Sequence, residues 1–251
     1  MTNREKYNFD YFTIDNYRKQ LELALENGFQ FILFTDDFQK DRKEILWRHD
    51  VEFSPDVALK MARIESELGV TTTYFFQLHS EFYNILERYF SDMLLKIKSL
   101  GHHIGLHFDS HYYNIQSEND LDKFIRQDKE YFEKVFHLKT EVFSFHNNTQ
   151  FTLSCRNKSY GGLLNVYSDY YKTKYKYCSD STGYWRYEVL EDVLKDLKIT
   201  HLQVLVHDAM WSEKVLSPRK RVYQSIQKNA DRIKNQYDRV LTQFGAKNID
   251  D

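Results

Sequence analysis

Three of the helices that the sequence predicts end at a glycine, and an apolar strand follows each glycine. Apolar residues recur at helical spacing before these glycines, and glycine readily adopts the left-handed conformation that closes a helix. The glycines stand at positions 28, 69 and 101, and the strands are expected over residues 29–34, 71–78 and 103–108. Repetition of helix, glycine and strand is typical of parallel βαβ units.

The alternation continues along the rest of the 251 residues. Further strands are predicted over residues 45–47, 141–145, 164–167, 175–178 and 201–206. A single domain of this length fits either a closed barrel or an open doubly wound sheet. We favour the barrel, as a single-domain α/β fold that forms an incomplete or distorted (β/α) barrel. Residues 1–44 would be an N-terminal extension of this domain, which spans residues 1–251.

A long helix is predicted at the C-terminal end, over residues 217–251. Ser217 and Pro218 are suited to its N-cap and first helical position. The apolar positions expected to face the domain are Val222, Ile226, Ile233, Val240 and Leu241. The basic residues of this helix are interpreted as a solvated face rather than as a nucleic-acid surface.

The composition of the chain argues against nucleic acid and a membrane as partners. Lys and Arg number 35 against 37 Asp and Glu, a net charge of −2, which gives no electrostatic reason to expect nucleic acid. No apolar run approaches the roughly 20 residues of a membrane span, and the first residues have no apolar segment of signal-peptide type. We therefore expect a cytoplasmic location. Cys155 and Cys178 are then expected to be free thiols.

Histidines follow five of the predicted strands. The carboxyl ends of parallel strands meet at one edge of a sheet, where loops converge and ligands bind. These histidines are His49, followed directly by Asp50, and His79, His107, His146 and His207. The sequence therefore predicts that residues far apart along the chain meet in one site.

Two of the histidines, His107 and His111, are four residues apart. If a helical turn follows Phe108, both side chains lie on one face and could bind one metal ion, given a carboxylate from elsewhere. The alternative is that one or both are ordinary surface or half-buried histidines.

Residues Gly101 to His111 read Gly-His-His-Ile-Gly-Leu-His-Phe-Asp-Ser-His. This segment resembles the second motif of the NodB-type polysaccharide deacetylases, carbohydrate esterase family four, whose usual form is Gly-His-Glu-Ile-Gly-x-His-x-x-Ser-His. The segment from Arg48 to Glu52 stands where that family has its Asp-Asp motif, and Val204 to Asp208 resembles its late Leu-x-His motif. The resemblance covers residues 45–208 and implies a barrel of the polysaccharide deacetylase type.

The resemblance implies a divalent metal, with zinc as the expected ion, bound by Asp50, His107 and His111. His49 would then act as the catalytic base and His207 would protonate the leaving amine. An alternative register makes Asp50 the base and Glu52 a ligand, because side chains two apart on a strand share a face. The family's Arg-Pro motif is missing, and His49-Asp50 replaces its Asp-Asp pair.

The remaining candidates are substrate contacts. We expect His79, His146, Asp180, Trp185 and Trp211 to line the substrate site, the tryptophans as platforms for sugar rings. Two functions are open: a metal-dependent hydrolase that removes an acetyl group from an amino sugar or related amide during surface-polysaccharide biosynthesis, or a catalytically impaired relative that binds a carbohydrate or protein partner.

Overall fold

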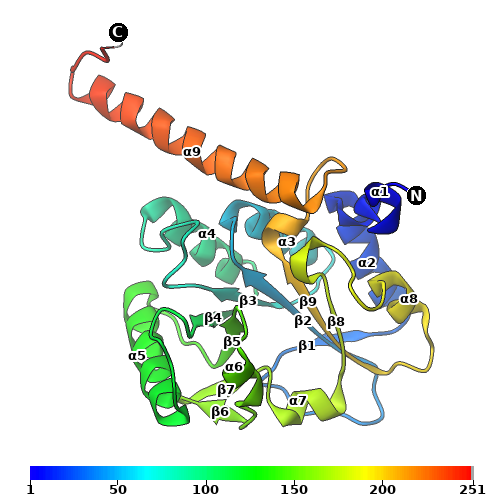
Figure 1. Ribbon diagram of the computed structural model, residues 1–251. Coiled ribbons are helices and arrows are strands. Elements are labelled where there is room, and N and C mark those ends of the chain that lie inside the picture. The colour runs from blue at the N-terminus through cyan, green and yellow to red at the C-terminus, as the bar shows by residue number, and fades with distance from the viewer. Residues whose placement is uncertain (250–251) are drawn as a thin grey trace.

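The strands of the computed structural model, which describes residues 1–249, form one sheet (Figure 1). They are β1 (Gln30–Ile32), β2 (Glu44–Val51), β3 (Thr73–Phe76), β4 (His103–Asp109), β5 (Val142–His146), β6 (Ser159–Tyr160), β7 (Leu163–Asn165), β8 (Lys176–Ser179) and β9 (His201–His207). Their order is β6-β7-β5-β4-β3-β2-β9-β8, with β1 beside β2, and every pair is parallel except β6 with β7. Within residues 1–249, β6 and β8 do not pair, so the barrel is incomplete, as the sequence predicted.

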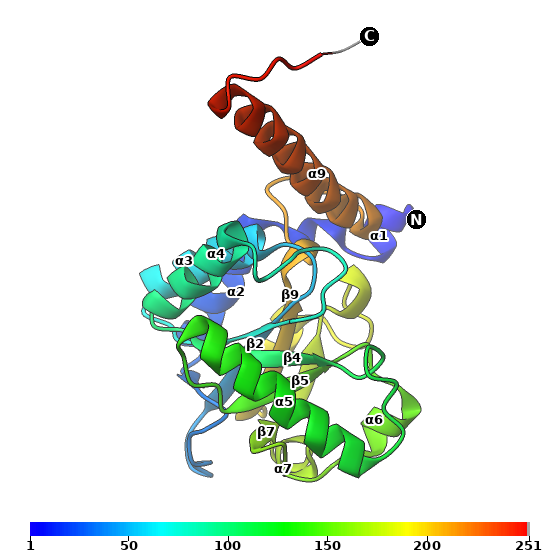
Figure 2. The same cartoon turned by 90° about the vertical axis from the view of Figure 1, so that its left-hand side faces the viewer.

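Helices surround this sheet, and the last of them lies above it (Figures 1 and 2). They are α1 (Asn3–Lys6), α2 (Ile14–Glu26), α3 (Pro55–Glu67), α4 (Arg88–Ser99), α5 (Glu118–Phe136), α6 (Gln150–Ser154), α7 (Asp169–Lys174), α8 (Leu190–Lys195) and α9 (Pro218–Gln243), with short 3-10 helices η1 (Phe9–Phe12), η2 (Ser181–Gly183) and η3 (Asp208–Met210). The predicted glycine ends are confirmed, because Gly28, Gly69 and Gly101 all have positive φ. Within residues 1–44, α2 packs on the core and β1 pairs with β2 in the sheet.

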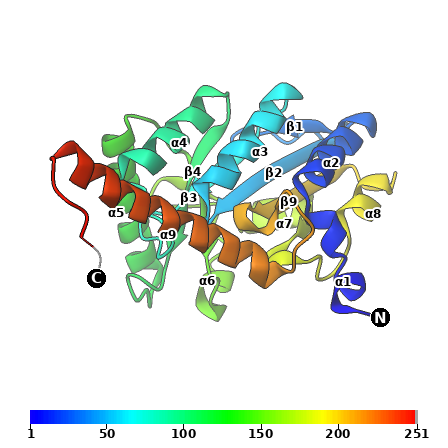
Figure 3. The same cartoon turned by 90° about the horizontal axis from the view of Figure 1, so that it is seen from above.

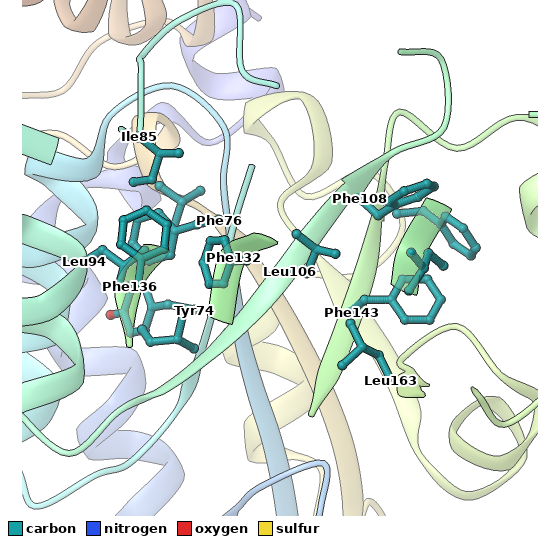
Figure 4. Packing of buried hydrophobic residues seen from close by; sticks show 14 of the residues in the cluster. Tyr74, Phe76, Ile85, Leu94, Leu106, Phe108, Phe132, Phe136, Phe143 and Leu163 are labelled. Atoms are coloured by element: carbon teal, nitrogen blue, oxygen red, sulfur yellow. The ribbon is translucent and has the colours of Figure 1, made fainter. Parts of the chain in front are cut away.

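Buried aromatic and aliphatic side chains fill the space between the sheet and α4 and α5 (Figure 4). Strand residues Tyr74, Phe76 and Leu106 are completely buried, and Leu94 of α4 and Phe132 of α5 pack with them. Glycine is required within β4, because a Cβ on Gly105 would lie 2.5 Å from the Phe75 ring. The core therefore explains one glycine of the histidine motif without reference to a ligand.

The last helix departs from the prediction. Val222 packs against the core, but Ile226 and Ile233 are 43% and 55% exposed, so they do not face the domain. Seen from above, α9 crosses the top of the molecule and continues past it (Figure 3). Among residues 1–249, no helix is both long and apolar enough to cross a membrane.

Candidate metal centre and active site

Strand β2 sends alternate side chains to opposite faces of the sheet. Arg48, Asp50 and, just past the strand, Glu52 reach the same side, where Asp50 and Glu52 line a cavity. His49 points the other way and is fully buried. The face that carries the chemistry is therefore the Asp50 and Glu52 face.

Glu52 meets two histidines from neighbouring strands. Its Oε1 atom lies 3.3 Å from Nε2 of His107 on β4 and 3.0 Å from Nδ1 of His146 on β5. One donor atom from each of these three residues lies within 4.8 Å of the other two. A carboxylate and two imidazoles are a donor set that binds zinc and related divalent ions.

A hydroxyl group orients His107. Nδ1 of His107 lies 2.6 Å from Oγ of Ser144, and that hydroxyl donates to Oδ1 of Asp50 at 3.1 Å. Because the Ser144 hydrogen goes to Asp50, the His107 Nδ1–H donates to Ser144, which leaves Nε2 directed at Glu52. Such an outer partner fixes the tautomer of a metal-binding histidine.

Glu52 is held in place by a second carboxylate. Asp208, completely buried after β9, accepts hydrogen bonds from the backbone N–H groups of Glu52, at 2.9 Å, and of Phe53 and Ser54. Burial opposes ionisation of Glu52, but the nearby His207 and the contacts with the two cluster histidines hold its pKa well below the ordinary value. Glu52 is therefore an anion facing two imidazoles.

His207 lies in the cavity wall and is hydrogen-bonded to a buried carboxylate, that of Asp180. Oδ1 of Asp180 accepts from Nδ1 of His207 at 2.6 Å, and Oδ2 accepts from Nε1 of Trp211 at 2.9 Å. Burial lowers the pKa of His207, but the charges of Asp180 and Glu52, together with the hydrogen bond to Asp180, outweigh this and raise the pKa to about 10. His207 is therefore protonated at neutral pH.

Arg48 lies beside Asp50. Its Nη2 is 3.8 Å from Oδ2 of Asp50, and its guanidinium stacks 4.6 Å from the centroid of the Tyr167 ring. The side chain is fully buried, and none of its nitrogen atoms has a hydrogen-bond partner among residues 1–249. Its charge therefore acts on Asp50 with little screening by solvent.

The cavity at this edge has a volume of about 620 Å³. Asp50, Glu52 and His207 lie in its wall. Aromatic and charged side chains complete it: Phe53, Tyr167, Tyr177, Tyr187, Arg186 and Glu188. A wall of aromatic rings with a few polar groups suits a sugar, whose ring faces stack and whose hydroxyl groups form hydrogen bonds.

The structure corrects the assignment of His49 as the base. Nε2 of His49 lies 2.6 Å from Oε1 of Glu65 on α3, and the ring stacks on Tyr74 at 3.9 Å. Glu65 also accepts from the hydroxyl groups of Tyr17 and Thr72. His49 thus belongs to a buried polar network on the outer face of β2, remote from the cavity wall.

Replacing His49 with phenylalanine should therefore lower stability and spare the site. The variant keeps the stacking on Tyr74, but the buried carboxylate of Glu65 loses its imidazole partner. We therefore expect the free energy of unfolding, measured with urea, to fall by about 3 kcal/mol. Metal content and turnover of the folded protein should stay near those of wild type. A stable variant that binds metal but has lost turnover would restore His49 as the base.

His111 and His79 also lie outside the cluster. The chain leaves β4 in a turn, and Nε2 of His111 lies 2.8 Å from the backbone oxygen of Asn147 instead of facing Glu52. The Asn147 side chain in turn contacts Nε2 of His146 at 2.8 Å. His79 stacks on Tyr112 and contacts Tyr113, so the structure gives it a local packing role.

Three predicted substrate contacts have other roles. Asp180 and Trp211 are buried and support His207. Trp185 packs against Phe12 and Trp211 at ring distances of 5.5 and 6.3 Å. The aromatic cavity wall comes instead from tyrosines, chiefly those of residues 167–187, which the sequence did not single out.

Comparison with solved structures finds carbohydrate esterases. A family 4 carbohydrate esterase from Bacillus anthracis is 17% identical, with 83% of this chain and 86% of that one covered and a TM-score of 0.47. The chitin deacetylase of Colletotrichum lindemuthianum is 15% identical over 79% and 86%, with a TM-score of 0.43. A family 4 pseudoenzyme from Bacillus anthracis is 11% identical over 76% and 63%, with a TM-score of 0.40. No protein-family model and no curated protein matches the chain.

The fold and the site define a parallel α/β protein whose incomplete barrel carries a carboxylate and histidine cluster at the carboxyl ends of its strands. The chain resembles polysaccharide deacetylases in its histidine motif, and the solved structures that it matches include such enzymes. At these identities and TM-scores, function follows from the site's own residues and not from the likeness.

Proposed function

We propose that this protein is a metal-dependent hydrolase that removes an acetyl group from an amino sugar, such as a precursor of a surface polysaccharide. The observation that carries the proposal is the arrangement of the cavity wall. The metal-type cluster of Glu52, His107 and His146 stands beside a second carboxylate, Asp50, and a protonated imidazole, His207. Hydrolysis of an amide needs this combination of a base and an acid.

The cluster fits a divalent cation by its chemistry. Nitrogen atoms of His107 and His146 both converge on one oxygen of Glu52, so a cation among the three would receive two lone pairs and a negative charge. Zinc is the ion we propose. When bound, it would supply Lewis acidity and a water of lowered pKa.

Residues around the cluster supply the base, the acid and the contacts with the substrate. Asp50 accepts the proton of the attacking water, and Ser144 and Arg48 hold its carboxylate in place. His207, held by Asp180, gives a proton to the leaving nitrogen. The tyrosine wall binds the sugar ring, and Arg186 and Glu188 are placed to contact its hydroxyl groups.

The test is acetate release from a panel of N-acetylated amino sugars and their oligomers. We expect the purified, zinc-loaded protein to release acetate, a chelator to stop the release and added zinc to restore it. Asp50→Asn should keep its zinc and lose about 10²- to 10⁴-fold in turnover, the range for removal of a general base. Zinc-loaded protein that binds the sugars but releases no acetate would identify a binding protein instead.

A further inference from the structure

Helix α9 presents an unpartnered apolar seam. Its apolar residues outside the core recur at alternating steps of three and four: Tyr223, Ile226, Ala230, Ile233, Tyr237, Val240 and, at the C-cap, Phe244. Tyr223, Ile233, Tyr237 and Phe244 are all more than half exposed. A repeat of 3.5 residues keeps a seam on one side of a helix that coils around another helix. The pattern covers three heptads.

The domain occupies a different side of the same helix. Asn229 donates to the backbone oxygen of Phe82, and Arg232 forms two bonds to Glu87 at 2.6 and 3.0 Å. Within residues 1–249, no side chain from position 233 onward bonds to the domain. The end of α9 projects away from it (Figures 1 and 2). About three turns of helix thus lack packing from the domain, and isolated helices of fewer than about 12 to 15 residues are marginal in water.

We infer that α9 pairs with α9 of a second copy of this chain, as a short two-stranded coiled coil that makes the protein a dimer. The residues that flank the seam permit self-association, because they are Gln227, Asn229, Lys234, Gln236, Leu241 and Gln243, with one charge among six. Two identical seams therefore meet without opposed rows of like charge. A two-fold interface of this kind buries the same patch on both copies.

The charges favour a protein helix over a membrane as the occupant. A helix that lies on an anionic membrane carries Lys and Arg along its polar face. Here Lys228 and Arg232 are paired with Asp56 and Glu87 of the domain. From position 231 onward, the charges on the helix other than Arg232 are of mixed sign, with Lys234 beside Asp231 and Arg239 next to Asp238 in the sequence.

Light scattering of the full-length protein during size exclusion tests the inference. Wild type should elute at twice the mass of the 30.4-kDa chain at micromolar concentration. The double variant Ile233→Lys, Tyr237→Lys should elute as a monomer, because it places charge in the seam, with the dimer dissociation constant raised about 100-fold or more. Asn235→Lys, Thr242→Lys adds the same charge away from the seam and should remain dimeric.

Circular dichroism should be unchanged in Asn235→Lys, Thr242→Lys, whereas Ile233→Lys, Tyr237→Lys should lose at most the helical signal of the about three turns that pairing supports. Metal content should be unchanged in both double variants, which separates loss of pairing from loss of folding. A wild-type protein that is monomeric up to about 1 mM, or a dimer that survives Ile233→Lys, Tyr237→Lys, would overturn the inference. Monomeric wild type that sediments with anionic phospholipid vesicles would also overturn it, and would assign the seam to a membrane surface. None of these outcomes depends on the proposed hydrolase activity.

Discussion

Glu52→Gln should remove the metal from the proposed site and with it the activity. The amide keeps the shape of the side chain but withdraws the negative charge that faces His107 and His146, and an amide oxygen is a far weaker ligand for zinc. We expect the affinity for zinc to fall at least about 100-fold, so that the purified variant contains little metal. Elemental analysis and acetate release measure the two effects on one sample.

The matched control is Glu81→Gln, which makes the same change at an exposed position and should keep full metal content. Alanine variants then distinguish the ligand set of the structural cluster, which includes His146, from the set inferred from the sequence motif, which includes His111. His146→Ala should lose the metal as Glu52→Gln does, whereas His111→Ala should retain most of it, because His111 faces the backbone of Asn147. Loss of metal from His111→Ala with retention by His146→Ala would restore the set inferred from the motif.

The presence and order of the strands were predictable because period-two and period-3.6 patterns are local, although β2 continues to Val51 beyond the predicted residues 45–47. Helix ends at glycine and the placement of chemistry at the carboxyl ends of parallel strands follow from such patterns, and the structure gathers Asp50, His107, His146 and His207 at one edge. The sequence also contained the signal for Glu52, because a residue two places after Asp50 shares its face. The family motif instead suggested two adjacent residues, His49 and Asp50. Because side chains alternate along a strand, His49 lies on the opposite side of the sheet from Asp50.

Other features depend on contacts between distant segments. Nothing near Asp208 in the sequence indicates that it binds the backbone of residues 52–54, and nothing near Glu65 indicates that it receives His49. Residues 147–185 fold into elements of two to six residues, such as β6 and α7, which are too short to show a period. The tyrosine wall of the cavity comes largely from this segment, so the substrate side of the site was the least predictable.

His207→Gln should reduce turnover about 10²- to 10⁴-fold with zinc still bound, because it removes the proton donor for the leaving nitrogen. The pH dependence tests the mechanism further. His207 acts in its protonated form, so activity is lost as the pH rises through its pKa, which the neighbouring Asp180 helps to raise above the ordinary value. Asp180→Asn withdraws that charge, lowers the pKa of His207, and should shift the alkaline limb of kcat to lower pH.

Trp211→Phe provides the control for this shift. It removes the other side-chain partner of Asp180 but leaves the carboxylate charge beside His207, so the alkaline limb should stay near that of wild type even if stability falls. Wild type, Asp180→Asn and Trp211→Phe are compared in their zinc-loaded forms. The effect of the cation on the pKa of His207 is then the same in all three proteins. An alkaline limb that is the same in Asp180→Asn and wild type would mean that His207 is not the group that titrates there, and the acid would have to be sought elsewhere in the cavity wall.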